Sequence, residues 1–368
     1  MTDFPLDGAP RATADSRIRV LIADDSLTVR KRLVVALESA PDILVLGEVS
    51  DGRRAVDACR ELRPDVLLLD IVMPHLDGVR ATEEIMAASA TRILIVSGHE
   101  RKGDASESMS ALEAGAVDAI EKPRSDESDA AFDARLLRAV RLVARVPVVT
   151  RRKAARYVTP PEVPPPEPAV AVRRDLVLVG GSTGGPAAVV DFLRGLPPGF
   201  PLPILLVLHI GPSFGFAFAD WLDGMSHVRA VEVTDGAALR PGYVHVCPPE
   251  RHLVLRGQKL VLTRDAERHS CRPSVDVLFE SGAESAGSRA IACLLTGIGR
   301  DGAEGLARLH ARGALTMAQD EASSVVFGMP RAAIALGAAN HVLPPREMAL
   351  VAASAARAGR PPFRTHGR

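Results

Sequence analysis

The chain has 368 residues, well above the ~150 residues of a typical domain, so two domains are expected. Apolar residues make up 47% and charged residues 24%, which is typical of a globular protein with a hydrophobic core and argues against extensive disorder. The 45 Lys and Arg residues balance the 45 Asp and Glu residues, and aromatic residues make up only 4%. A nucleic-acid-binding protein that depends on bulk positive charge or on base stacking is therefore not expected.

The sequence also indicates where the protein works. No run of ~18 apolar residues predicts a transmembrane helix, and the N-terminal segment lacks the basic and then apolar pattern of a signal peptide. The four cysteines show no CxxC or other metal-binding spacing, which is typical of a reducing compartment; they are Cys59, Cys247, Cys271 and Cys293. We therefore expect a cytoplasmic protein that does not insert into a membrane.

A proline-rich segment divides the chain. Residues 159–168 read TPPEVPPPEP and contain six prolines. Because proline fixes φ and lacks a backbone N–H group, such a segment forms an extended spacer and not part of a sheet or helix. We expect a first domain at residues 17–145, a linker at 146–173 and a second domain at 174–358.

Apolar segments alternate with amphipathic ones in the first domain. The amphipathic segments include Thr28–Leu37 and Arg53–Leu62. Strands are expected at Ile18–Ala23, Ile43–Val49, Val66–Leu69, Arg92–Val96 and Val117–Ile120. Short apolar strands separated by helices predict a parallel sheet covered on both faces, so we expect a doubly wound, flavodoxin-like α/β domain.

The second domain continues this alternation and adds a hairpin. Strands are expected at Leu176–Val179, Ile204–Leu208, Ile291–Leu295 and Ala314–Ala318, and helices at Ala187–Leu193, Phe214–Leu222, Val275–Ala286 and Ala303–Arg312. The short apolar segments Leu253–Leu255 and Leu260–Leu262 flank a polar turn and predict the hairpin. We expect a second doubly wound domain whose sheet is mainly parallel, with some antiparallel strands.

Polar side chains follow the strands of the first domain. Asp24 and Asp25 come after the first strand, Asp70 after the third, Ser97 after the fourth and Lys122 after the fifth. Because the carboxyl ends of parallel strands meet at one edge of a sheet, these side chains are expected to cluster. Clustered carboxylates repel one another, and Mg²⁺ relieves that repulsion. A carboxylate beside a metal ion and a lysine is suited to form an aspartyl phosphate. The alternative, that these are unrelated solvated side chains, does not account for their regular placement after the strands.

Several motifs of this domain resemble the receiver domain of two-component response regulators; they are ADDS (23–26), LLLDIVMPHLDG (67–78), VSG (96–98) and EKP (121–123). The resemblance implies a Mg²⁺ site made of Asp24, Asp25, Asp70 and the main-chain carbonyl of Val72. It also implies that Asp70 is the phosphoacceptor and that Ser97 and Lys122 contact the phosphoryl group. One position departs from the family, since Ala119 stands where receivers usually carry an aromatic switch residue. How phosphorylation would be signalled therefore stays open.

A glycine-rich turn opens the second domain. Residues 175–193 read DLVLVGGSTGGPAAVVDFL, which predicts a buried strand, a turn around Ser182 and a helix entered through Pro186. Ser182 could be a helix cap, part of a nucleotide-binding fingerprint, or a catalytic nucleophile at a strand-to-helix turn. The nucleotide fingerprint needs an acidic residue at the end of the next strand, where this chain has His209.

His209 favours the catalytic interpretation of Ser182. Neighbouring parallel strands bring the residues at their carboxyl ends together, so His209 can reach Ser182 and accept its proton. A carboxylate is then needed to orient the imidazole; Asp301 is the first candidate, and Asp276 and Asp320 are alternatives. The order Ser, His, Asp differs from the order in α/β-hydrolases, so that fold is not expected.

The motifs of the second domain resemble the catalytic domain of chemotaxis protein-glutamate methylesterases, the CheB family; they are GGSTGG (180–185), VLHIGPSF (207–214), RPSVDVLF (272–279), LTGIGRDGA (295–303) and QDEASSVVFGMP (319–330). A receiver, a linker and this domain together match that family's layout. The resemblance implies that Ser182 is the nucleophile, His209 the general base and acid, and Asp301 the orienting carboxylate. It further implies oxyanion donors at the backbone N–H groups of Thr183 and Ile298, and substrate contacts from Arg272 and Met329.

The resemblance implies a phosphorylation-regulated hydrolase that demethylates glutamate methyl esters, and deamidates glutamines, on methyl-accepting chemotaxis receptors. A chemotaxis histidine kinase would be the phosphodonor, Mg²⁺ would serve receiver phosphorylation, and hydrolysis would need no cofactor. A tethered receiver has a high effective concentration at its partner domain, so we expect it to cover the catalytic cleft until Asp70 is phosphorylated. A binding module with an unused triad and a DNA-binding response regulator are the alternatives. The receptor sites, the pathway and the oligomeric state stay open.

Overall fold

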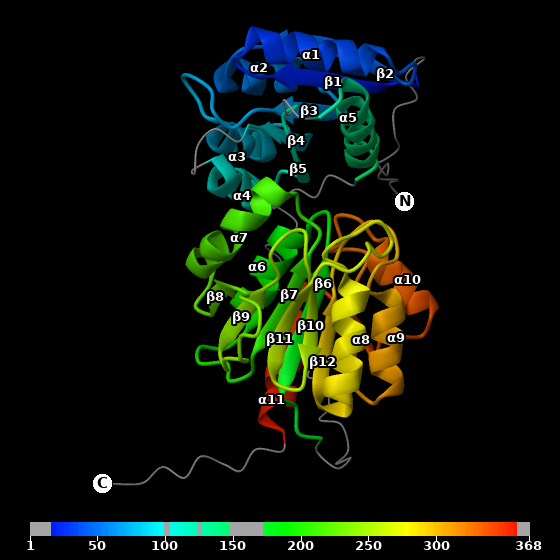
Figure 1. The fold of residues 1–368 in the computed structure, drawn as a ribbon. Helices are drawn as coiled ribbons and strands as arrows, with labels where there is room; N and C mark the ends of the chain where they lie inside the picture. Colours follow the sequence, from blue (N-terminus) through cyan, green and yellow to red (C-terminus); the bar gives the residue numbers. More distant parts are fainter. Residues whose placement is uncertain (1–15, 99–103, 124–126, 147–171, 359–368) are drawn as a thin grey trace, which may run out of the picture.

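The computed structural model describes residues 16–98, 104–123, 127–146 and 172–358. These residues form two α/β domains, which lie one above the other in Figure 1. The first runs from β1 (Ile18–Ala23) to α5 (Asp129–Val143), and the second from β6 (Leu176–Gly181) to α11 (Pro345–Arg357). Most of the predicted linker, residues 147–171, lies outside the described part of the chain.

The first domain is a five-stranded sheet with the order β2-β1-β3-β4-β5, and every neighbouring pair is parallel. Its other strands are β2 (Ile43–Val49), β3 (Val66–Leu69), β4 (Arg92–Ser97) and β5 (Asp118–Glu121), and its other helices are α1 (Leu27–Glu38), α2 (Gly52–Leu62), α3 (Gly78–Ala88) and α4 (Asp104–Ala114). Side chains of β1 alternate between two cores: Val20 and Ile22 pack with α1 and α5, whereas Leu21 and Ala23 pack with α2, α3 and α4. The sheet is therefore buried on both faces, as predicted.

The second domain has a seven-stranded parallel sheet with the order β14-β13-β12-β6-β7-β9-β8. Its other strands are β7 (Ile204–Leu208), β8 (Arg229–Glu232), β9 (Tyr243–Val246), β12 (Ala290–Leu294), β13 (Leu315–Gln319) and β14 (His341–Leu343), and its other helices are α6 (Gly185–Gly195), α7 (Pro212–Met225), α8 (Val275–Ser285), α9 (Ala303–Ala311) and α10 (Met329–Ala335). Helices α6, α7 and α11 cover one face. Helices α8, α9 and α10 cover the other, together with the antiparallel hairpin of β10 (His252–Arg256) and β11 (Lys259–Thr263).

The predicted strands and the hairpin are confirmed, and their ends differ from the structure by at most two residues. The antiparallel strands form a separate two-stranded sheet, so the main sheet of the second domain is wholly parallel. Three strands were not predicted, namely β8, β9 and β14. Strands β8 and β14 are short and lie at the sheet edges, where exposed residues weaken the apolar signal.

Helix α4 of the first domain packs against α6 and α7 of the second. The apolar residues Met109 and Leu112 of α4 belong to the same hydrophobic core as Phe214 and Phe218 of α7. Two polar contacts flank this core: Arg194 pairs with Glu113 at 2.9 Å, and the Thr183 hydroxyl donates to Oδ2 of Asp118 at 2.9 Å. The edge strand β5 and α4 thus place the first domain over the carboxyl edge of the second sheet (Figure 1).

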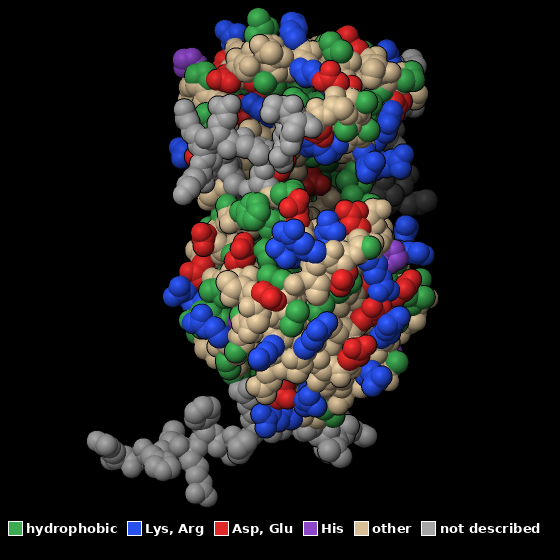
Figure 2. All heavy atoms as spheres, in the orientation of Figure 1, with side chains coloured by type: hydrophobic (Ala, Val, Ile, Leu, Met, Phe, Trp, Pro, Cys, Tyr) green, Lys and Arg blue, Asp and Glu red, His purple; other side chains and the backbone are tan. Residues whose placement is uncertain are grey.

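The molecular surface carries charges of both signs. Figure 2 shows Lys and Arg side chains interspersed with Asp and Glu side chains over the visible face of the second domain, and the surface narrows where the two domains meet. The visible face therefore carries no extended basic patch. Within the described part of the chain, every helix is too short or too polar to cross a bilayer.

Candidate active site

Ser182 lies in the turn between β6 and α6. Its backbone N–H donates to Thr296 O at 2.9 Å, and its carbonyl accepts from Gly185 N at 2.6 Å. Gly184 has φ of 76°, and a Cβ there would lie 2.5 Å from the side chain of Val325. Only glycine can make this turn, because a side chain would be strained and would clash. The turn holds Ser182 at the carboxyl edge of the sheet.

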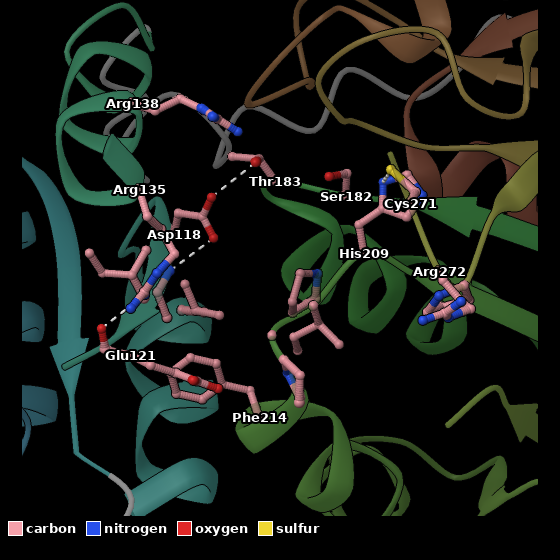
Figure 3. Close-up of a pocket in the computed structure, with 18 of the residues that line it drawn as sticks. Asp118, Glu121, Arg135, Arg138, Ser182, Thr183, His209, Phe214, Cys271 and Arg272 are labelled. Atoms are coloured by element: carbon pink, nitrogen blue, oxygen red, sulfur yellow. Dashed lines mark hydrogen bonds between the residues drawn. The ribbon is translucent and has the colours of Figure 1, made fainter. Parts of the chain in front are cut away.

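The hydroxyl of Ser182 is available for chemistry. The N-cap of α6 is Gly184, with no side-chain capping hydrogen bond, so the helix-cap interpretation of Ser182 is not supported. Within the described part of the chain, Ser182 Oγ has no hydrogen-bond partner. It lines a cavity of about 740 Å³ between the two domains, together with His209 and Cys271 (Figure 3).

His209 follows β7 directly, and its backbone N–H donates to Gly181 O at 3.0 Å, which fixes it beside the Ser182 turn. Its Nε2 atom lies 2.8 Å from Oδ2 of Asp301. Its Nδ1 atom lies 3.7 Å from Sγ of Cys271, and both residues line the cavity. No hydrogen bond joins His209 to Ser182 among the described residues, as is common before a substrate tightens a catalytic site.

Asp301 is the carboxylate that contacts His209. It is 2% exposed and follows β12, in the turn before α9. Besides His209, three donors reach it: the Ser274 hydroxyl and Val275 N at 2.7 Å each, and Asp276 N at 3.1 Å. These groups lie at the start of α8, where backbone N–H groups favour negative charge. The helix therefore holds the carboxylate in its charged form.

The two alternative carboxylates have other partners. Asp276 accepts from Gly305 N at 2.6 Å and lies 3.1 Å from Nε2 of His269. Asp320 interacts with Ser323 in the turn after β13. Neither carboxylate has a hydrogen bond to His209 among the described residues, so Asp301 is the one that the structure joins to the imidazole.

Burial and hydrogen bonding act in opposite directions on this pair. Burial would lower the pKa of His209, but its contacts with Asp301 and Cys271 raise the pKa from 6.5 to about 9. Burial would raise the pKa of Asp301, yet hydrogen bonds from His209, Ser274 and Val275 lower it from 3.8 to about 2. The pKa shifts therefore favour a charged carboxylate at Asp301 and a more basic imidazole at His209.

The predicted oxyanion donors lie beside Ser182. A Cβ on Gly297 would come within 2.7 Å of the Cβ of Ser182, so the turn that carries Ile298 packs directly on the serine. In the described part of the chain, the backbone N–H groups of Thr183 and Ile298 have no acceptor. They can therefore donate to an oxygen that becomes negative near Ser182.

The two predicted substrate contacts differ in position. Arg272 lines the cavity, and one of its guanidinium nitrogens donates to Asp265 O at 3.2 Å. Met329 is fully buried, and its sulfur would lie 2.2 Å from a Cβ on Gly297. Its sulfur packs beneath the Gly297 turn, and its contact with substrate stays a prediction.

The carboxylates of the first domain cluster at the carboxyl edge of its own sheet. Asp24 and Asp70 are 1% and 4% exposed, and Lys122 Nζ lies 2.7 Å from Oδ2 of Asp24 and 2.8 Å from Oδ2 of Asp70. Ligand oxygens of Asp24, Asp25 and Asp70 all lie within 4.8 Å of one another. Three such oxygens are the donors that Mg²⁺ prefers, so these residues fit that ion.

The remaining predicted residues of this edge surround Asp70. Ser97 is buried at the end of β4, and its carbonyl accepts from Lys122 N at 2.9 Å. Val72 is exposed in the loop after β3. Burial raises the pKa of Asp70 from 3.8 to about 6, with Lys122 opposing the shift and Asp24 adding to it.

Two neighbours of the catalytic pair were not predicted as site residues. Ser274 lies in the motif RPSVDVLF, where a serine before an apolar segment predicts the helix cap that it forms on α8 by accepting from Val277 N at 3.4 Å. The sequence could have suggested this cap, but not the hydrogen bond to Asp301. Cys271 carries no signal in the sequence, because only the folded loop brings it to His209.

The two doubly wound domains and their two sites define a hydrolase, different in fold from the α/β-hydrolases, that carries a receiver. In agreement, the family model of the CheB methylesterase matches residues 177–351, and that of the response regulator receiver domain matches residues 20–130. The chain belongs to the CheB family of protein-glutamate methylesterases/protein-glutamine glutaminases.

Relatives match over nearly the whole length of the chain. Protein-glutamate methylesterase/protein-glutamine glutaminase 3 of Anaeromyxobacter dehalogenans (strain 2CP-C) is 41% identical over 336 residues, which cover 90% of this chain and 97% of the relative. The protein-glutamate methylesterase/protein-glutamine glutaminase of Nitrosospira multiformis is 40% identical over 338 residues, which cover 90% of this chain and 95% of the relative. The crystal structure of the Thermotoga maritima CheB methylesterase catalytic domain is 35% identical and covers 50% of this chain and 99% of that one, with a TM-score of 0.48.

Proposed function

We propose that this protein hydrolyses glutamate methyl esters on chemotaxis receptors, and deamidates glutamines there, with Ser182 as the nucleophile. The observation that carries the proposal is the contact of His209 Nε2 with Asp301 at 2.8 Å. It fixes the proton on Nε2 and leaves the lone pair of Nδ1 facing the cavity that Ser182 lines. A hydroxyl, an imidazole and a buried carboxylate then act in sequence.

The first half of the reaction forms an acyl-enzyme. His209 Nδ1 takes the proton of Ser182 Oγ as the oxygen attacks the γ-carbonyl carbon of the methylated glutamate. The carbonyl oxygen becomes negative and accepts hydrogen bonds from the N–H groups of Thr183 and Ile298. The tetrahedral intermediate then expels methoxide, which takes the proton from His209 and leaves as methanol.

The second half releases the receptor. A water molecule gives its proton to His209 Nδ1 and attacks the acyl carbon, and Ser182 Oγ leaves with the proton that His209 returns. The product is a glutamate side chain. For a glutamine substrate the leaving group of the first half is ammonia, and the second half is the same. Arg272, on the cavity wall, contacts the receptor segment.

The receiver supplies the regulation of this chemistry. Asp70 is the phosphoacceptor, and a chemotaxis histidine kinase is the phosphodonor. Asp24, Asp25, Asp70 and the Val72 carbonyl would hold Mg²⁺, which would supply neutralisation of charge on the phosphoryl oxygens. Lys122 and Ser97 contact the phosphoryl group, so Lys122 exchanges its present carboxylate partners for a phosphoryl oxygen.

Docking of the receiver restricts access to Ser182. Across the cavity from Ser182 and His209 lie receiver residues, among them Asp118 and Glu121 of β5 (Figure 3), and Ala119 lines the same cavity. Asp118 accepts from the hydroxyl of Thr183, the residue whose N–H group is an oxyanion donor. Lys122 directly follows β5. Its movement toward a phosphoryl group therefore displaces the strand that holds Thr183, without an aromatic residue at position 119.

The proposed hydrolysis is tested by measuring methanol release from methylated receptor membranes. Ser182→Ala should lower the rate by ~10⁴–10⁶, because the nucleophile and its base act as a unit. Ser288→Ala, an exposed serine at the opposite edge of the sheet, is the control and should keep the parental rate. Full activity of Ser182→Ala would remove this serine from the mechanism. If the unaltered protein released no methanol, the remaining interpretation would be a binding module whose triad is unused.

The expected location and partners follow from the same chemistry. The substrate lies on the cytoplasmic part of membrane receptors, so the protein works in the cytoplasm and reaches the membrane through its substrate. Salt-sensitive binding to DNA would instead support the alternative of a transcription factor.

A further inference from the structure

The proposed hydrolysis does not use the thiol of Cys271. This side chain is half-buried and lines the catalytic cavity, whereas Cys59, Cys247 and Cys293 are buried. Its Sγ atom lies 3.7 Å from Nδ1 of His209, the nitrogen that must accept the proton of Ser182. A sulfur atom and the catalytic base therefore meet where substrate binds.

A tight turn fixes the position of Cys271. Arg268 N donates to Cys271 O at 3.1 Å, and Cys271 N donates to Arg268 O at 2.9 Å. The two residues between them, His269 and Ser270, have φ of 51° and 58°. Both residues adopt the left-handed backbone conformation although neither is glycine. The backbone of this turn therefore fixes the position of the thiol.

The distance between sulfur and nitrogen suits zinc. Typical bonds of Zn²⁺ are ~2.3 Å to a thiolate and ~2.05 Å to an imidazole, so two such ligands at a tetrahedral angle lie about 3.6 Å apart. The observed separation of Sγ and Nδ1 is 3.7 Å. Asp301 holds the opposite nitrogen of the ring at 2.8 Å, which is the usual role of a carboxylate behind a zinc-bound histidine.

We propose that Cys271 and His209 form a Zn²⁺ site in the catalytic cavity, and that Zn²⁺ bound there blocks hydrolysis. On binding, the Cys271 thiol and the protonated Nδ1 of His209 each release a proton to solvent, and the thiolate and Nδ1 each give a lone pair to the metal, while water from the cavity completes the coordination. The lone pair on Nδ1 is then no longer free to take the proton of Ser182. The metal-binding part of this proposal is independent of the proposed function, and the inhibition part rests on it.

A second cluster provides a competing site and a control. Donor atoms of His269, Asp276 and Glu304 also lie within 4.8 Å of one another. Asp276 already accepts from Gly305 N and His269, and Glu304 lies 3.4 Å from Arg268. This cluster has no sulfur ligand, so a spectroscopic probe that detects thiolate coordination separates it from the Cys271 site.

The first experiment measures binding of Co²⁺, a spectroscopic substitute for Zn²⁺, to the full chain in excess Mg²⁺. The unaltered protein should show a thiolate-to-cobalt charge-transfer band that Zn²⁺ removes. Cys271→Ser and Cys271→Ala should lose this band, and His269→Ala should keep it. Absence of the band from the unaltered protein, or its survival in both Cys271 variants, would overturn the site.

The second experiment measures methanol release against Zn²⁺ concentration, with each variant compared with its own metal-free rate. Half-inhibition of Cys271→Ser should need at least ~10-fold more Zn²⁺ than half-inhibition of the unaltered protein. Loss of a residue that only supports a metal ligand already lowers metal affinity about 10-fold, and loss of the ligand itself should lower it at least as much. His269→Ala should be inhibited like the unaltered protein. Equal inhibition of the unaltered protein and Cys271→Ser, or a cobalt band without inhibition by Zn²⁺, would overturn the inhibitory role.

Discussion

Two buried aspartates, Asp70 and Asp301, lie at the carboxyl edges of the two parallel sheets, and their environments affect their pKa values in opposite directions. Burial raises the pKa of Asp70 to about 6, and Lys122 only partly offsets it. Asp301 is as deeply buried, but hydrogen bonds led by that from His209 lower its pKa to about 2. The same position in a doubly wound fold therefore gives two kinds of carboxylate.

The difference between the two carboxylates lies in their donors. Asp301 has four hydrogen-bond donors, three of them from Ser274 and the start of α8. Asp70 has one backbone donor, Ile71 N at 2.8 Å, and shares Lys122 with Asp24. A carboxylate whose hydrogen bonds are complete orients a neighbour, whereas one with incomplete neutralisation is suited to receive a cation and a phosphoryl group.

The comparison is tested most strongly by removing the charge of Asp301. Asp301→Asn should lower the rate of methanol release by roughly 10⁴, because an amide no longer holds the His209 proton on Nε2. The matched control is Asp320→Asn, whose carboxylate contacts Ser323 of its own turn among the described residues, and it should change the rate less than about threefold. Equal losses in both variants would show that Asp301 does not orient the base.

The pH dependence of hydrolysis probes the same pair. Only neutral His209 can accept the serine proton, and its pKa is raised to about 9. The value of kcat/KM should therefore rise with pH, by roughly tenfold for each pH unit below that pKa. The contacts that raise the pKa of His209 come from Asp301 and Cys271 and not from lysine or arginine side chains. Added salt should therefore change the pH profile of kcat/KM little. A profile that is flat between pH 6.5 and 9 would contradict a raised pKa.

The receiver side of the comparison is tested by Asp70→Asn. This variant should take up no phosphoryl group, and a phosphodonor should no longer accelerate methanol release, whereas its basal rate should match that of the unaltered protein. Asp57→Asn, an exposed carboxylate on α2, is the control and should respond normally. Phosphorylation can be followed with radiolabelled donor. Acceleration of Asp70→Asn by the donor would place the phosphoacceptor elsewhere.

The smallest expected effect concerns the contact between the two domains. Asp118→Ala removes the acceptor of the Thr183 hydroxyl and should raise the basal rate by about two- to tenfold, the net value of one hydrogen bond. Asp129→Ala, an exposed carboxylate at the start of α5, should leave the rate unchanged. A basal rate of Asp118→Ala equal to that of the unaltered protein would show that this hydrogen bond does not hold the receiver over the cleft.

Much of this protein follows from its sequence. The apolar strands and the polar residues after them predicted two parallel sheets and placed Asp24, Asp70 and Lys122 at one edge. The turn GGSTGG and the histidine after the next strand placed Ser182 beside His209. These predictions rest on local patterns and on one geometric rule, that the carboxyl ends of parallel strands share an edge.

Other features depend on contacts between distant segments. The sequence left Asp276 and Asp320 as alternatives to Asp301, and it did not show that Met329 packs beneath the Gly297 turn. It also gave no indication that Cys271 reaches His209 or that Asp118 reaches Thr183. Residue types and spacing determined which chemistry is possible here, while the choice of partners was decided only by packing, because hydrogen bonds depend on atomic positions that no local pattern encodes.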